Sequence, residues 1–353
     1  MTPRMVTFAS GLLALILLQA SWTGISSLAD AASQDSSALF ERNGMPYELF
    51  DELPSTPIKV MDSEFDVAFA PGDLDLTHDQ VLKWISTAAH SVAAYYGRFP
   101  VKRVRVLVIP VPGRGTHGVS FGYKGAATKI SLGKFTTEKY LQRDWVMTHE
   151  MVHMTFPLLP DTYSWIGEGI ATYVEPIARA QVGQISVEKV WADMLSGLPQ
   201  GLPKAGDRGL DHTHTWGRTY WGGALFCLLA DVRIRERTHN RYGLQDALRA
   251  IAAAGGTIES TAELSYIFKV GDDAVGVPVL TELYRQMKDT PVVTDLPDLW
   301  QRLGVEMQGD GVVFNDAAPL AAIRQVITRA PLPPSLAAPA VSAKTVLDKP
   351  LTF

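Results

Sequence analysis

A short motif with two histidines constrains this chain most, because it fixes one helix and the chemistry on its surface. Residues 149–153 read HEMVH and lie in a segment, roughly residues 137–156, whose apolar spacing predicts a helix. Residues four apart share a helix face, so His149 and His153 can direct two imidazoles at one metal ion. Glu150, offset by about 100°, can reach a water on that metal. With 8 histidines in 353 residues, chance produces this pattern in fewer than roughly one such chain in a hundred.

A second segment, residues 165–175 with the sequence WIGEGIATYVE, contains a third candidate ligand. Glu168 follows His153 by 15 positions, across two prolines, which leaves room for a reversal and a second helix. We expect the flanking Gly167 and Gly169 to let this helix approach the first one closely. Zinc in catalytic sites takes three protein ligands and a water, so the two histidines and Glu168 are the predicted ligands of one Zn²⁺.

Two further residues lie on the same face of the second helix. Thr172 and Glu175 follow Glu168 by four and seven positions, and they are candidates for the hydrogen bonds that orient metal-binding histidines. The alternative for this segment alone is an ordinary amphipathic helix with surface acids. The upstream motif favours the metal site, since a buried unpaired glutamate is costly whereas a zinc-bound one is stabilised.

The two motifs together resemble the gluzincin metallopeptidases, in particular the superfamily of the thermolysin-like, M1 and M61 (glycyl-aminopeptidase) enzymes. The residues GEGIA around Glu168 are similar to the NEGFA block of the M1 branch. Residues 220–225 and 228–235, which read YWGGAL and LLADVRIR, are similar to a glycyl-aminopeptidase pattern of a tyrosine, a glycine and a helix ending in LDxxIR. The resemblance covers roughly residues 100–255 and implies a gluzincin-like catalytic domain.

The resemblance also implies a role for Tyr220, because the matching tyrosine of M1 enzymes polarises the scissile carbonyl and stabilises the oxyanion. The chain departs from the family in three places. Gly222 stands where M1 enzymes usually carry lysine, the spacing between His153 and Glu168 is shorter than theirs, and no PDZ-like segment of the M61 kind is present. The sequence therefore predicts the superfamily and leaves the branch open.

Composition and charge exclude several classes of protein. A chain that is 46% hydrophobic and 20% charged has enough apolar content for a core, which excludes a disordered chain or a disulfide-stapled miniprotein. Lysine and arginine total 32 against 37 acidic residues, and no basic stripe is visible, so we expect no nucleic-acid partner. The single cysteine, Cys227, cannot form an intramolecular disulfide.

Residues 1–31 predict a signal peptide. Arg4 precedes an uncharged, mostly apolar run over residues 5–18 that is several residues too short to span a membrane, and Ala29 and Ala31 flank a candidate cleavage site. We therefore expect an exported protein, periplasmic or extracellular, with a peptide or protein substrate as its partner. The alternative is an uncleaved anchor, the one case in which we expect membrane contact.

The rest of the chain predicts an α+β fold, in which a small mixed α/β lobe precedes a mainly helical lobe. Local patterns predict a helix at residues 77–96 and strands at residues 103–111 and 127–132. The expected segments are a lead-in (32–56), an N-terminal α/β lobe with a glycine-rich loop (57–135), a helical catalytic lobe (136–304), a C-terminal strand and helix (305–330) and a Pro/Ala-rich tail (331–353).

The glycine-rich stretch bears on the type of cleavage. In M1 aminopeptidases this region carries a glutamate that holds the free amine of the substrate, whereas residues 113–134 contain no acidic residue here. This favours internal cleavage, or recognition of an acidic or C-terminal carboxylate group, with Arg114 and His117 as candidate substrate-binding residues. The alternative is a flexible surface loop with solvated charges.

His212 and His214 precede Tyr220 and are candidate transition-state donors, as a histidine is in thermolysin-like enzymes; the alternative is a plain polar loop.

The sequence thus predicts an exported zinc metallopeptidase with Glu150 as general base, acting on a peptide held against the strand at residues 127–132. It predicts an endopeptidase rather than an M1-type aminopeptidase. The alternative is a catalytically silent gluzincin-fold protein that binds a peptide or protein partner. The sequence does not separate a peptidase from a hydrolase of another amide or an ester.

Overall fold

Strands rich in branched apolar residues build a five-stranded mixed sheet in the first lobe. The computed structural model describes residues 40, 44–309 and 311–330, so the predicted signal peptide and the Pro/Ala-rich tail lie outside the described residues. The strands lie in the order β1-β2-β3-β5-β4. β2, β3 and β5 are parallel, and β1 and β4 pair antiparallel at the two edges. The strands are β1 (Ser55–Val60), β2 (Ser63–Phe69), β3 (Arg103–Val111), β4 (Thr116–Phe121) and β5 (Ala127–Gly133).

Helices cover both faces of this sheet, which is why β3 is apolar along both of its sides. Val104, Val106 and Val108 pack on the side of α3 (His78–Tyr96). Leu107 and Ile109 pack on the opposite side, with α2 (Tyr47–Glu52). The predicted helix at residues 77–96 and the strands at 103–111 and 127–132 are confirmed. The segment expected as a lead-in is corrected, because α2 and the start of β1 lie within it and α2 is part of a core.

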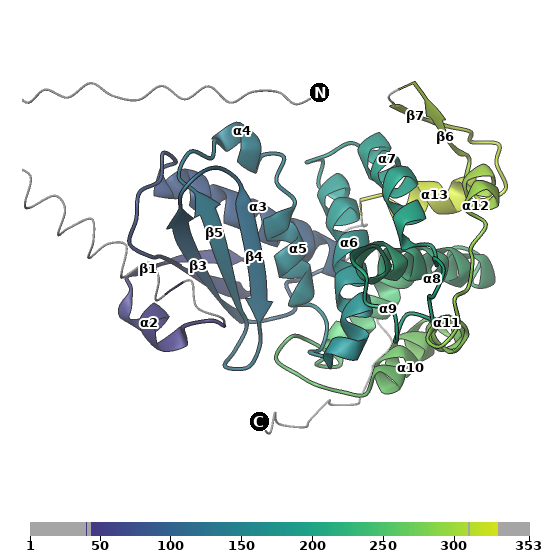
Figure 1. Cartoon of the computed structure of the whole chain (residues 1–353), viewed down its shortest axis with the longest axis horizontal. Coiled ribbons are helices and arrows are strands. Elements are labelled where there is room, and N and C mark those ends of the chain that lie inside the picture. Colours follow the sequence, from purple (N-terminus) through teal and green to yellow (C-terminus); the bar gives the residue numbers. More distant parts are fainter. Residues whose placement is uncertain (1–39, 41–43, 310, 331–353) are drawn as a thin grey trace, which may run out of the picture.

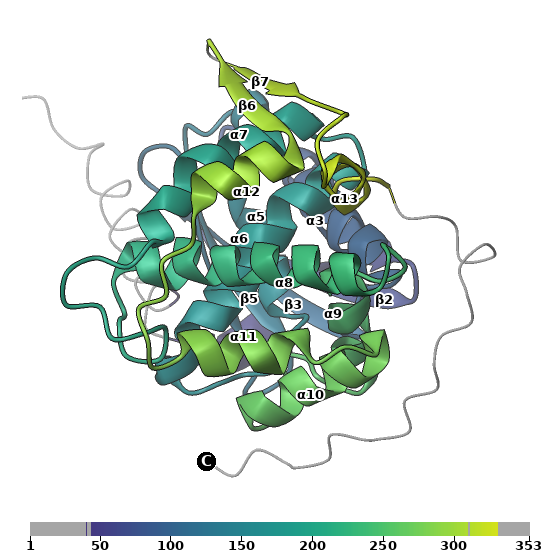
Figure 2. The ribbon, with the colours of Figure 1, turned by 90° about the vertical axis from the view of Figure 1, so that its right-hand side faces the viewer.

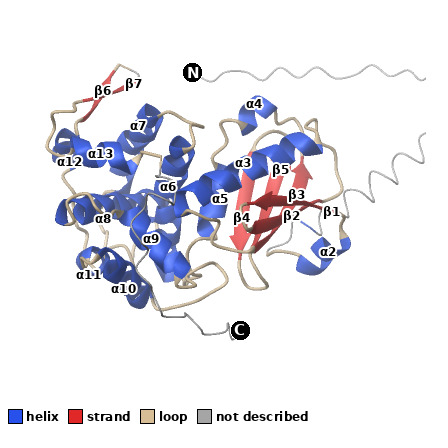
Figure 3. Cartoon of the chain, turned by 180° about the vertical axis from the view of Figure 1, so that it is seen from behind, coloured by secondary structure: helices blue, strands red, loops and turns tan. Residues whose placement is uncertain are grey.

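The second lobe is helical, as Figures 1 and 3 show, and the expected α+β fold is confirmed. In Figure 2, α8 crosses the middle of this lobe, with α9, α10 and α11 on one side and α12 with the β6–β7 hairpin on the other. No helix among the described residues is long and apolar enough to cross a membrane. The elements of this lobe include α7 (Val187–Gly197), α8 (Gly223–Arg237), α9 (Leu244–Ala253), α10 (Leu264–Val275), α11 (Val279–Met287), α12 (Leu296–Leu303), β6 (Val305–Gln308), β7 (Gly311–Phe314) and α13 (Ala321–Ile327), with the 3₁₀ turns η1 (Asp161–Tyr163) and η2 (Leu198–Gly201).

The single helix expected over residues 137–156 is divided into α4 (Glu138–Leu141) and α5 (Val146–His153). The Asp144 carboxylate causes the division, because it accepts a hydrogen bond from the backbone N–H of Met147 at 3.1 Å and so satisfies the start of a new helix. The same carboxylate accepts a hydrogen bond from the Thr116 hydroxyl. Asp144 therefore ties edge strand β4 to the first turn of α5.

Helix α6 (Ser164–Gln181) packs against both α5 and α8, and glycine makes its contact with α8 possible. A Cβ on Gly169 would lie 2.4 Å from the backbone of Gly223, and one on Gly223 would lie 2.0 Å from the carbonyl oxygen of Trp165. The sequence led us to expect Gly167 and Gly169 to bring this helix close to the first one. That expectation is wrong, because Gly169 faces α8 and a Cβ on Gly167 would meet nothing within 4 Å.

These two glycines make a matched pair for a stability test. We expect Gly169→Ala to lower the free energy of unfolding by about 1–3 kcal/mol, since the added methyl group forces α6 away from α8. Gly167→Ala has room, and we expect it to raise the free energy of unfolding by about 0.5–1 kcal/mol through helix propensity. Urea unfolding followed by circular dichroism measures both. Equal effects of the two substitutions would contradict the close packing of α6 on α8.

Candidate metal centre

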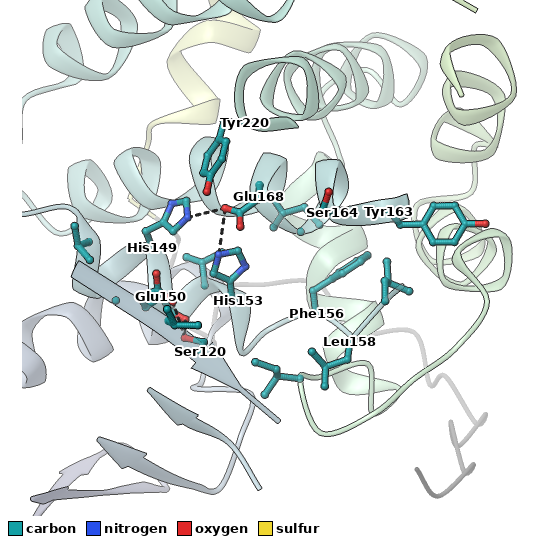
Figure 4. Close-up of a pocket in the computed structure, with 18 of the residues that line it drawn as sticks. Ser120, His149, Glu150, His153, Phe156, Leu158, Tyr163, Ser164, Glu168 and Tyr220 are labelled. Atoms are coloured by element: carbon teal, nitrogen blue, oxygen red, sulfur yellow. Dashed lines mark hydrogen bonds and ion pairs between the residues drawn. The ribbon is translucent and has the colours of Figure 1, made fainter. Parts of the chain in front are cut away.

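Three side chains from α5 and α6 converge on one point, as Figure 4 shows. The Glu168 carboxylate oxygen Oε2 lies 3.1 Å from His149 Nε2 and 3.4 Å from His153 Nε2. Two ligands that each lie about 2.0–2.1 Å from a tetrahedral zinc ion are about 3.3 Å from one another. The Glu168 carboxylate therefore lies from each histidine at about the distance that separates two ligands of one zinc ion. Ligand atoms of His149, Glu150 and His153 also lie within 4.8 Å of one another.

Burial and mutual charge set the protonation of this cluster. Burial lowers the pKa of His149, which favours the neutral imidazole that binds metals. For His153 burial is the largest single effect, but the hydrogen bond and charge of Glu168 together with the charge of Glu150 outweigh it and raise the pKa. Burial also acts on Glu168, but hydrogen bonds and charge from the two histidines hold the pKa of its carboxyl well below the usual value. Glu168 is thus an anion beside the two rings.

Edge strand β4 holds the predicted base. Ser120 Oγ donates to Glu150 Oε2 at 2.9 Å, and it also lies 2.9 Å from the backbone carbonyl oxygen of Glu150. A Cβ on Gly118 would lie 2.5 Å from Glu150 Cγ, so the strand fits closely over the glutamate. The expected peptide contact with residues 127–132 is corrected, because β4 lies between β5 and the site and has its own free edge.

Tyr220 lies in a π-helical turn, η3 (Arg218–Gly222), which runs directly into α8. Its ring is near parallel to that of His149, with centroids 6.2 Å apart, and Trp216 stacks on it at 5.7 Å. Single π turns within helices often occur at functional sites. Burial and the carboxylates of Glu168 and Glu150 raise the pKa of Tyr220 to about 12, so its hydroxyl stays protonated at neutral pH.

Four predicted residues are placed differently from expectation. Within the described chain Thr172 makes no hydrogen bond to either histidine, and Glu175 is bound instead to Arg179, at 2.7 Å in a buried pair. Burial raises the pKa of Glu175 to about 7. His212 pairs with Asp289 at 2.8 Å, and neither it nor His214 lines the pockets at the centre. The expected roles as histidine-orienting residues and transition-state donors are therefore corrected.

The two candidate substrate-binding residues separate in the structure. His117 lies on β4 and lines the pocket at the metal centre, whereas Arg114 lies in the preceding turn and lines neither pocket. The alternative of a flexible loop for the glycine-rich stretch is wrong, because most of its first half forms β4. The sequence did not indicate β4 because a strand is recognised from alternating apolar and polar side chains, and Gly118 and Gly122 have none.

Two pockets meet at the centre. The first pocket, a cavity of about 490 Å³, extends from β4 past His153 to an apolar end formed by Phe156, Leu158 and Ile258. The second pocket, of about 610 Å³, extends toward α7. Trp145, His149 and Tyr220 line both. The centre is therefore open on two sides.

Sequence reasoning missed Ser120 and Arg143, which lines the second pocket. Gly118 and Ser120 are two apart, and a period of two would have placed both on one face of a strand. No local signal marks Arg143, since most of its neighbours in the second pocket come from distant segments of the chain, among them α6, α7 and η3.

Comparisons with known proteins bear on the fold. No protein-family model and no curated protein matches the sequence. An aminopeptidase N family protein from Idiomarina loihiensis aligns with a TM-score of 0.54 and 14% identity over 73% of this chain and 50% of its own. An M1 zinc metallopeptidase from Deinococcus radiodurans aligns with a TM-score of 0.45 and 16% identity over 69% of this chain and 52% of its own. The chain thus spans about half the length of these structures. The fold of this chain is therefore similar to that of the aminopeptidase N family protein over the aligned part.

Proposed function

We propose that this protein is an exported, zinc-dependent peptidase that cleaves within peptide chains. One observation carries the proposal, namely that His149, His153 and Glu168 converge at zinc-ligand spacing next to a buried Glu150. The donor set of two imidazole nitrogens and one carboxylate suits zinc and leaves a position for water. A zinc ion held there would polarise a substrate carbonyl and lower the pKa of a water toward neutrality.

The residues of the chain supply the proton transfers. Glu150, held by Ser120 at 2.9 Å, accepts a proton from the attacking water and returns it to the leaving amine. Tyr220 donates a hydrogen bond to the carbonyl oxygen as negative charge develops there, and its raised pKa keeps that proton in place. The free edge of β4 offers backbone groups to an extended peptide, which would pair as a further strand.

Internal cleavage is favoured by the shape and charge of the site. The first and second pockets continue on both sides of the centre, so a peptide can extend past it in both directions. β4 carries no carboxylate that would hold a substrate's terminal amine. Three acidic residues are found among the described residues that line the first pocket. Two of them are Glu150 and Glu168, and the third is Asp161, seven positions before Glu168.

Export rests on the sequence of residues 1–31 alone. A peptidase with this location would act on peptides or proteins outside the cytoplasm. Membrane contact belongs to this proposal only if the signal sequence stays attached.

Metal analysis tests the centre directly. We expect the purified protein to contain one zinc ion per chain and Glu168→Ala to lose most of it, because two histidines alone form a weak site. Glu150→Gln should retain the zinc and lose nearly all hydrolysis, since the amide cannot accept the proton. Elemental analysis gives the zinc content, and mass spectrometry of a peptide mixture, with and without a chelator, gives the cleavage.

Two results would contradict the proposal. Hydrolysis by Glu150→Gln at the wild-type rate would remove Glu150 as base. Full zinc occupancy without cleavage of any peptide would favour the alternative of a silent gluzincin-fold binding protein.

The tyrosine gives a second test. We expect Tyr220→Phe to lower kcat by a factor of about 10²–10³ with unchanged zinc content, as the loss of one oxyanion donor does. Tyr266→Phe, on α10 and outside both pockets, is the matched control and should keep the wild-type kcat. Steady-state kinetics on one peptide compares the three proteins. An equal kcat for Tyr220→Phe and the wild type would exclude Tyr220 from the reaction.

A further inference from the structure

The charges of the second pocket are balanced except at one residue. Glu175 pairs with Arg179 at 2.7 Å, and Lys189 pairs with Asp193 at 2.6 Å. Among the described residues, Arg143 makes no ion pair, and its exposed side chain is the remaining charged group that lines this pocket. An arginine that has no protein partner in a pocket is free to bind a carboxylate from a ligand.

The rest of the pocket suits a peptide. Trp145 and Trp216 are 52% and 60% exposed, and Trp221 completes an aromatic wall. Exposed aromatic rings of this kind cover the apolar parts of a bound chain at little cost in conformational freedom. The first pocket differs, because its described lining contains no lysine or arginine and includes the carboxylate of Asp161. The two sides of the centre therefore differ in charge.

The course of β4 relates this difference to the direction of a substrate. Residues 116–120 of β4 line the first pocket, and Thr116 at the start of the strand is bound to Asp144, directly beside Arg143 and Trp145, which line the second pocket. At the other end Gly122 contacts Ile258, which lines the first pocket. A peptide that pairs antiparallel to β4, the more stable arrangement, directs its C-terminal part toward the second pocket.

We infer that Arg143 is a specificity residue, which binds a carboxylate on the C-terminal side of the cleaved bond. The carboxylate comes from an acidic side chain or from the free C-terminus of the substrate. The inference rests on the proposed function and names its substrate class, peptides that are anionic just beyond the cleavage site.

Paired peptides test this on the zinc-loaded full chain. One set carries Glu or Gln at each of the first three positions after the cleaved bond, and another ends in a free carboxylate or an amide. We expect the wild type to show at least about tenfold higher kcat/KM for the anionic member of a pair, the effect of one charge-assisted hydrogen bond. Arg143→Gln should abolish this ratio and Arg143→Lys should restore part of it. Arg98→Gln, an exposed arginine outside both pockets, is the control and should keep the ratio.

The two peptide sets identify the source of the carboxylate. If the enzyme prefers only peptides with a free C-terminus, Arg143 binds the terminal carboxylate and the enzyme releases short C-terminal fragments. If it prefers Glu over Gln at any peptide length, Arg143 binds an acidic side chain and the enzyme cleaves before acidic residues. Equal kcat/KM within every pair, or a ratio that survives Arg143→Gln, overturns the inference.

A binding measurement separates failure of the inference from failure of the proposed function. The Glu150→Gln protein is titrated with the same peptides, with tryptophan fluorescence as the signal, so no turnover is needed. We expect the anionic peptides to bind with a Kd at least about tenfold lower, and Arg143→Gln in that background to remove the difference. If the wild type cleaves no peptide, the proposed function fails and this titration alone decides the role of Arg143. Equal Kd values for anionic and neutral peptides would then overturn it.

Discussion

The position of α6 between α5 and α8 is the constraint on which the rest of the site depends. Gly169 of α6 contacts Gly223 of α8, and neither position has room for a Cβ atom. That contact fixes the helix that carries Glu168, and the packing of α6 on α5 brings its carboxylate within 3.4 Å of both histidines. The entrance of α8 then supplies Tyr220 through its π turn. Helix α6 thus fixes where α5 and the π turn at the start of α8 lie around the centre.

The sheet lobe shares its apolar core with α5, and hydrogen bonds from its edge strand complete the site. Thr116 and Ser120, both on β4, bind Asp144 before α5 and Glu150 within it. These bonds keep the free strand edge beside α5, the helix of the two candidate histidine ligands. They also restrain Glu150, which would otherwise have three side-chain torsions to order for each proton transfer. The edge strand therefore supports the side chain of the proposed base and leaves its outer edge free for the proposed peptide.

Charge is distributed unevenly around the centre. The anion of Glu168 is matched by the two imidazoles, and a buried pair (Glu175 with Arg179) and an exposed pair (Lys189 with Asp193) neutralise most ions of the second pocket. Arg143 on one side and Asp161 on the other remain to meet a ligand. This difference in charge between the two sides agrees with the inferred substrate, whose anionic C-terminal part lies on the side of Arg143.

The sequence alone determined several elements and the candidate ligand set. The period of apolar residues predicted α3 and β3, because such a period depends on neighbours within a few residues along the chain. The motifs HEMVH and GEG predicted His149, His153 and Glu168 as candidate ligands. Only the tertiary structure decided which other polar groups reach the centre. Glu175 binds Arg179 and His212 binds Asp289, so neither reaches the histidines or the centre. Ser120 and Arg143 line the site instead, and they come from other elements. A polar side chain takes whichever partner packing brings within about 3 Å, and that choice is made in space rather than along the chain.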